Sequence, residues 1–507
     1  MSVIERQTVA GRAPGGQTAR SAGAARLPRR LLRRIPRAAW ICALVATINA
    51  VAWSIVTPPF QAPDEPSHFA YVQHLAETGH LPSSSKEVFA PAEAVALEDL
   101  HQAEVRFSQE NPTISTLAQQ RLLERGLALP LSRSTPGDAG LAASQPPLYY
   151  ALETVPYELG TGGSVLDRLE LMRLLSALMG GACALLTFLF LREALPAAPW
   201  AWTVGGLSVA LMPSLGTMSG AVSPDALLAP IATALFYLLA RGFRRGLSAA
   251  VAVALGATIA AGCLAKLTFL ALLPGAIFGC AVLVWRAARA GRLPSARSLT
   301  LAGGVAVLPA AAYGLRDASA AQPSANVVSG AFALHGQHTI GGALSYMWQL
   351  YLPRLPGMDA TFHGINGSLL WFEALVGQYG WIETTFPWWV VRIAFVPAAL
   401  LGLLCVCALV ANRGSLWARR LELASYGAIS LGLLVAIGLD EYLHGAQGEY
   451  LQLRYLLPLV ALAGAGLALA ARGAGRRWGP VAGALIVTLM LGHDLFSQLL
   501  VISRYYG

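Results

Sequence analysis

The chain has 507 residues, of which 55% are hydrophobic and only 12% are charged, whereas a soluble globular domain carries about 25% charged residues. This composition excludes a water-soluble enzyme, a disordered scaffold and a DNA-binding domain, and it predicts an integral membrane protein. The net charge of +9 comes from short basic clusters between apolar runs. That pattern sets the orientation in a membrane and does not indicate nucleic-acid binding.

Apolar segments of about 20 residues, enough to cross roughly 30 Å of hydrocarbon, recur along the chain. The sequence therefore predicts an all-α polytopic membrane protein with about eleven transmembrane helices. Their expected positions are 38–56, 170–194, 199–217, 225–241, 247–265, 268–285, 298–315, 388–410, 421–439, 455–471 and 480–500. The run 148–160 is too short to cross and contains Glu153 and Glu158, so we expect an interfacial or partly inserted helix there.

Arginine clusters predict the orientation, because Lys and Arg of short loops stay on the cytoplasmic side. The predicted organisation is a basic cytoplasmic N-terminal tail (1–37), a transmembrane module (38–315), an extracytoplasmic segment (316–387) and a C-terminal transmembrane module (388–507). The first module includes a long extracytoplasmic loop, 57–169, which we expect to carry juxtamembrane helices. The expected result is a plasma-membrane protein with a cytoplasmic N-terminus and an extracytoplasmic site. This site is expected in a cavity at the outer membrane face, formed by the loop 57–169, the turn 218–224 and the segment 316–387.

This orientation predicts the outcome of thiol labelling. A cysteine placed at Ser84 should react from outside the cell with an impermeant reagent, and one placed at Ala288 should not. The background must lack the six native cysteines, which all lie in apolar stretches and for which we expect neither disulfides nor a zinc site. The reverse labelling pattern would disprove the orientation.

The segment directly after the first span contains the most informative residues. It reads TPPFQAPDEPSHFAY from Thr57 to Tyr71, and its prolines favour a defined non-helical course that ends in a helix near Pro66. Asp64 and Glu65 then lie at the positive end of that helix. A carboxylate placed there could act as a general base or hold a divalent cation, or it could simply cap the helix.

An acid pair in this position resembles the signature of the GT-C superfamily of polytopic glycosyltransferases, which use polyprenyl-phosphate-linked sugars. Further stretches resemble one uncharacterised, largely actinobacterial branch of GT-C-like membrane proteins, although Leu453 stands where glycine is expected. These stretches are SQPPLYY (144–150), SPDA (223–226), GQYGW (377–381) and QLRYLLP (452–458).

The resemblance implies roles for individual residues. Asp64 would be the general base of an inverting transfer, and Glu65 would orient it or help to bind a cation such as Mg or Mn. Asp225 would be a second acid of the same cavity, or alternatively a helix N-terminal acid. Lys266 and Arg454 would bind the donor phosphate, or alternatively extend to the headgroups. Arg173 is a weaker third phosphate ligand, and the substrate-lining candidates are His68, Gln145, Tyr149, Trp381 and Tyr455.

The segment 316–387 is rich in aromatic residues, which usually anchor a protein at the membrane interface. This is the expected role of Trp388 and Trp389, whereas Trp371 or Trp381 could stack on a sugar. The sequence HGQH at 335–338 lacks further ligands at zinc spacing, and no metal is expected there.

These observations favour a membrane glycosyltransferase that moves a sugar from a polyprenyl-phosphate donor to an extracytoplasmic glycan, lipid or protein acceptor. Two alternatives remain open. A transporter or flippase of lipid-linked sugars usually shows inverted repeats and charges within its spans, and neither pattern is evident. The other alternative is a non-catalytic, GT-C-like assembly partner.

Overall fold

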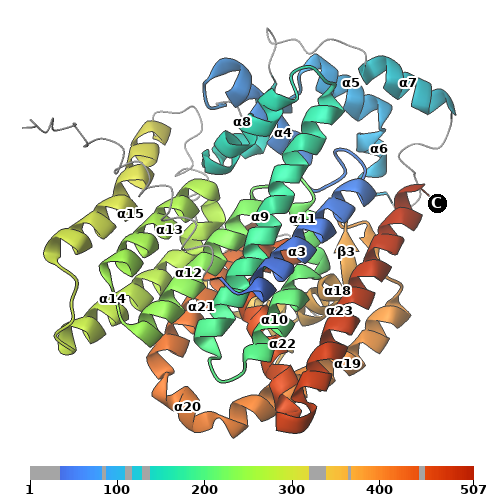
Figure 1. Ribbon diagram of the computed structural model, residues 1–507. Helices are drawn as coiled ribbons and strands as arrows, with labels where there is room; N and C mark the ends of the chain where they lie inside the picture. The colour runs from blue at the N-terminus through green and yellow to red at the C-terminus, as the bar shows by residue number, and fades with distance from the viewer. Residues whose placement is uncertain are drawn as a thin grey trace, which may run out of the picture.

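A computed structural model describes residues 35–82, 87–108, 117–127, 137–318, 339–362, 367–444 and 451–506. It confirms an all-α polytopic membrane architecture (Figure 1). Two small antiparallel strand pairs occur, β1 (Glu87–Val88) with β2 (Asp138–Ala139) and β3 (Gln378–Tyr379) with β4 (Thr384–Thr385). The predictions for most of the tail 1–37, for Ser84 and for HGQH concern positions outside the described residues.

Nine helices of the described residues are long and apolar enough to cross a membrane. Two of these spans begin with a short 3-10 turn, η2 (Leu267–Leu272) before α14 and η3 (Leu453–Leu459) before α22. The helices are α3 (Arg37–Val56), α9 (Val165–Ala194), α12 (Asp225–Arg245), α14 (Leu273–Arg289), α15 (Ala296–Asp317), α19 (Trp388–Ala411), α21 (Arg420–His444), α22 (Val460–Gly473) and α23 (Gly475–Tyr506).

Two of the predicted spans are shorter than a full crossing. The expected helix 199–217 is broken into α10 (Pro199–Ala210) and α11 (Pro213–Ser219), because Pro213 cannot donate a helical hydrogen bond and begins a new helix. The expected helix 247–265 is α13 (Ala249–Ala265), of 17 residues. It is capped by the Ser248 hydroxyl and ends at the extended residue Lys266.

Short helices between α3 and α9 gather at one end of the bundle (Figure 1). Among them α8 has only 12 residues and contains the fully buried Glu153, in agreement with the predicted non-spanning helix. The shorter helices of the chain are α4 (Glu65–Thr78), α5 (Pro91–Asp99), α6 (Gln102–Val105), α7 (Leu117–Leu127), η1 (Gly140–Ser144), α8 (Leu148–Leu159), α17 (Ile340–Tyr351), α18 (Gly367–Gly377) and α20 (Arg413–Ala418).

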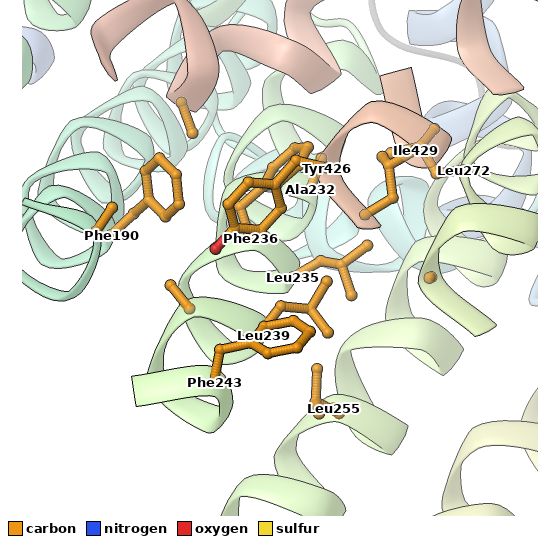
Figure 2. Close-up of a cluster of buried hydrophobic side chains, with 14 of the residues drawn as sticks. Phe190, Ala232, Leu235, Phe236, Leu239, Phe243, Leu255, Leu272, Tyr426 and Ile429 are labelled. Carbon is orange, nitrogen blue, oxygen red and sulfur yellow. The ribbon is translucent and has the colours of Figure 1, made fainter. Parts of the chain in front are cut away.

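The largest apolar core lies where α9, α12, α13, η2 and α21 meet. In Figure 2, Phe236 of α12 lies close to Tyr426 of α21, and the two rings pack edge to face with centroids 5.6 Å apart. Close helix contacts elsewhere depend on small residues, as is typical inside membranes. A Cβ atom on Gly205 of α10 would lie only 2.6 Å from the carbonyl oxygen of Gly464 in α22.

Helices α3 and α23 are joined by a buried polar cluster. Asp494 of α23 accepts hydrogen bonds from the Trp53 indole at 2.9 Å and from the Asn49 amide at 3.2 Å, both on α3. Gln498 donates to Asp494 and also to Asn49. Unpaired polar groups are costly in a membrane, so this mutual pairing holds the two helices together.

Candidate functional site

The proline-rich segment after α3 turns the chain sharply into α4. Phe60 and Asp64 both have φ near 62°, a left-handed conformation that is uncommon for residues other than glycine. Pro66 occupies the first turn of α4, and Asp64 precedes the helix as its N-terminal flanking residue. The sequence expectation that a helix opens near Pro66 with both acids at its start is confirmed.

Glu65 is fully buried and all of its acceptor capacity is used. Its Oε1 accepts from Arg173 Nε at 2.8 Å and from the Val222 amide at 2.9 Å. Its Oε2 accepts from an Arg173 terminal nitrogen at 2.6 Å and from the Phe60 amide at 3.0 Å. The carboxylate therefore joins α4, α9 and the turn before α12, which favours a structural role over the catalytic role that the resemblance implies.

Arg173 is likewise committed to the structure. Besides Glu65 it donates to the carbonyl oxygens of Ser54, Thr57 and Pro58, and its side chain has no exposed surface. The guanidinium thus neutralises the end of α3, where carbonyl groups lack helical partners. The geometry does not favour the weaker prediction that Arg173 binds a phosphate.

Asp64 differs from its neighbour because 45% of its side-chain surface is accessible. Its Oδ2 accepts a hydrogen bond from Arg454 at 2.7 Å. Desolvation by the surrounding protein raises the pKa of Asp64. The positive charges of Arg454 and Lys266, together with His68 when it is protonated in acid, outweigh this effect and lower the pKa to about 2. The site thus presents an ionised, reachable carboxylate.

A second ion pair joins Asp225 and Lys266. The Lys266 Nζ lies 2.8 and 2.7 Å from the two carboxylate oxygens of Asp225. Asp225 is the first residue of α12 and is 2% exposed, and Lys266 ends α13. The structure therefore brings together the four charged residues that the sequence placed at helix ends, and the sequence did not predict which carboxylate pairs with which cation.

His68 completes the group, and we call Asp64, His68, Asp225, Lys266 and Arg454 the charged cluster. The Nδ1 atom of His68 lies 3.0 Å from the hydroxyl of Tyr150. Burial lowers the pKa of His68 to about 4, and this exceeds the opposing effect of Asp64. The imidazole is therefore neutral at neutral pH, and the four charges balance around it.

Other substrate-lining candidates occupy different environments. Gln145 accepts from the Leu267 amide through Oε1 at 3.3 Å and so fixes the turn that contains Lys266. The Tyr455 ring lies beside the guanidinium of Arg454. Tyr149 is fully buried and its hydroxyl contacts Ser176 at 2.9 Å, which is a packing position.

Trp381 is not part of the charged cluster. Its ring packs edge to face against Phe107 and lies next to the guanidinium of Arg106. Trp371 stacks on Tyr351, so neither tryptophan is placed against the cluster by these contacts. Trp389, predicted as an interfacial anchor, borders the cavity described next, as does Trp53 of α3.

A large apolar groove begins at Arg454, and part of its lining comes from the segments 57–169, 218–224 and 316–387, where the sequence predicts a cavity at the outer membrane face. The groove has a volume of about 1070 Å³ and lies among α11, α18, α19, α22 and α23. Its lining extends along α19 from Trp389 to Cys405, a helical distance of about 24 Å at about 1.5 Å per residue. Helices α19 and α23 both pack against α22, and side chains from both helices border the groove.

The carboxylates do not fit a divalent cation in this arrangement. Such a cation needs carboxylate oxygens free to coordinate it, but the oxygens of Glu65 and Asp225 are directed at cationic side chains. Within the described residues, no three His, Cys, Asp or Glu side chains are grouped to hold a metal. The sequence-based expectation of Mg or Mn at Asp64 and Glu65 receives no support from this geometry.

Comparison with protein families gives one match, to the model described as predicted membrane protein (DUF2142), over residues 48–463. The chain belongs to this family of predicted membrane proteins. The match includes every residue of the charged cluster and much of the apolar groove. No curated protein and no solved structure matches the chain.

Proposed function

We propose that this DUF2142 protein is a membrane glycosyltransferase that transfers a sugar from a polyprenyl-phosphate donor to an extracytoplasmic acceptor. The observation that carries the proposal is the apolar groove with Arg454 at its end, ion-paired to the accessible Asp64. An isoprenoid tail requires an apolar channel of about bilayer depth, and its phosphate requires a cation at the polar end. The resemblance to GT-C enzymes adds independent support.

The chemistry follows from the positions of the charged residues. Asp64 takes the proton of an acceptor hydroxyl while that oxygen attacks the anomeric carbon. The bond between this carbon and the phosphate oxygen breaks, and polyprenyl phosphate leaves with the electron pair. The configuration at the anomeric carbon is inverted. Arg454 and Lys266 stabilise the charge on the leaving phosphate. Glu65 contributes by holding the Asp64 backbone in place through Arg173.

A substitution that fills the groove tests tail binding. Gly466 borders the groove, and a side chain added at this position would project into open space. Gly466→Phe should weaken binding of a lipid phosphate about ten-fold, since forcing extra volume into a site costs about 1–3 kcal/mol. The measurement is titration of farnesyl phosphate in detergent micelles.

The matched control is Gly303→Phe, on α15. A side chain added at Gly303 would also project into open space, and this residue is exposed on the helix surface, but it does not border the groove. The Gly303→Phe variant should bind farnesyl phosphate with the same affinity as the wild type. Equal affinities in all three proteins would place the tail elsewhere and remove the groove from the proposal.

A further inference from the structure

We propose that Asp64 and the donor phosphate compete for Arg454, so that donor binding releases Asp64 from its ion pair. This inference rests on the proposed function. It assigns a role to the ion pair itself: the base is held inactive until the donor is in place.

The charge balance of the cluster is the first argument. Two carboxylates, Asp64 and Asp225, are each bound by one cation. The nearby imidazole of His68 is neutral and supplies no further charge. Among the described residues of the charged cluster, an entering phosphate meets no cation that is not already paired with a carboxylate, and like charges in contact cost several kcal/mol. One carboxylate must therefore give up its partner.

The geometry indicates which carboxylate moves. Asp225 is 2% exposed and is bound by Lys266 through both oxygens. Asp64 is bound to Arg454 through one oxygen only and has 45% of its side-chain surface accessible. Asp64 is thus held less firmly and has open space next to it. Asp225 is held by two hydrogen bonds and is enclosed by the protein.

Arg454 itself is prepared for a second anion. It borders the apolar groove, and its Nε is buried without a hydrogen-bond partner. A guanidinium binds phosphate best through two parallel N–H groups. A phosphate at the end of the groove would satisfy Nε together with the terminal nitrogen that Asp64 now occupies.

The exchange has a chemical consequence. A carboxylate that accepts a bond from a guanidinium is a poor proton acceptor, because the positive charge stabilises its ionised form. When the phosphate neutralises Arg454, Asp64 becomes more basic and is free to turn toward the acceptor hydroxyl. The donor must therefore bind before Asp64 can act as the base, because both compete for the Arg454 side chain.

The test compares lipid-phosphate affinity in the full-length wild type and in Asp64→Asn. Asparagine tolerates the left-handed backbone at this position, so the variant keeps the turn and removes only the charge. We expect Asp64→Asn to bind farnesyl phosphate about ten-fold more tightly than the wild type. Binding of uncharged farnesol should be unchanged. Titrations are done in detergent with EDTA present.

Two further variants make the result decisive. Asp440→Asn removes a carboxylate of α21 that is 59% exposed and lies outside the cluster, and it should match the wild type. Asp64→Gly suits the positive φ and replaces Asp64→Asn if that variant is unstable. Weaker or equal binding of farnesyl phosphate to the Asp64 variants would overturn the competition.

The outcomes also separate this inference from the proposed function. If the wild type prefers farnesyl phosphate to farnesol and the Asp64 variants show no gain, the donor site stands and the competition is wrong. If neither the wild type nor the Asp64 variants distinguish the phosphate from the alcohol, the lipid-phosphate donor is wrong, and the competition is wrong with it. A requirement for added Mg that disappears in Asp64→Asn would replace competition by metal bridging.

Discussion

Asp64→Asn should reduce sugar transfer by about 10²- to 10⁴-fold, the usual contribution of a general base. The substitution keeps the size of the side chain and a hydrogen-bond acceptor for Arg454, but it removes the proton acceptor. The measurement is surface-glycan composition in a deletion strain complemented with wild type or variant at equal membrane levels. The sugar that is missing from the deletion strain then identifies the donor.

Asp440→Asn serves as the control in the same strain, since this exposed carboxylate lies near the C-terminal end of α21 and outside the charged cluster. It should restore the glycan fully. Restoration by Asp64→Asn to the same extent would make Asp64 a structural residue. Lipid transport or a role as an assembly partner would then explain the fold better than catalysis.

Glu65→Gln should destabilise the protein by about 3–5 kcal/mol, because the buried guanidinium of Arg173 loses its buried charged partner and keeps only the partly exposed Glu170. The side chains of Glu65 and Arg173 have no exposed surface. The expected observations are a lower unfolding temperature in detergent and less protein in the membrane. Any loss of transfer should follow the loss of folded protein.

Glu170→Gln provides a matched comparison for this effect. Glu170 also pairs with Arg173, at 3.2 Å, but 45% of its side-chain surface is exposed. Its loss should cost less than about 1 kcal/mol. If Glu65→Gln were as stable as wild type and yet inactive, Glu65 would be a catalytic residue, as the resemblance to GT-C enzymes implies.

Most of the helical architecture could be predicted because long apolar runs leave few alternatives in a bilayer. The errors occurred where local chemistry interrupts such a run. Pro213 divides one expected span, and the Ser248 cap and Lys266 shorten another. The capping box of Ser164 and Asp167 starts α9 five residues before the expected boundary at 170, a signal that was readable in the sequence.

The site was partly predictable for a different reason. The acids and cations of the charged cluster stand out as rare charges at the ends of apolar segments, so their residue types alone drew attention. Their pairing could not be predicted, because Arg454 and Asp64 are 390 residues apart. A cavity bordered by the segments 57–169, 218–224 and 316–387 was predicted, but its extension along α19, α22 and α23 was not, since that part is a space between helices. Trp381 was misleading because an aromatic residue near a motif carries no information on which way it faces.

The polar contact between α3 and α23 has a consequence for biosynthesis. The Asn49 amide donates to the Ala210 carbonyl and also to a carboxylate that lies 445 residues later in the chain, so the second of these bonds forms only after α23 has been synthesised. Until α23 has inserted beside α3, Asp494 cannot pair with Asn49 and Trp53, and the groove lacks the wall that α23 provides. The groove is therefore completed only after α23 has packed against α3 and α22.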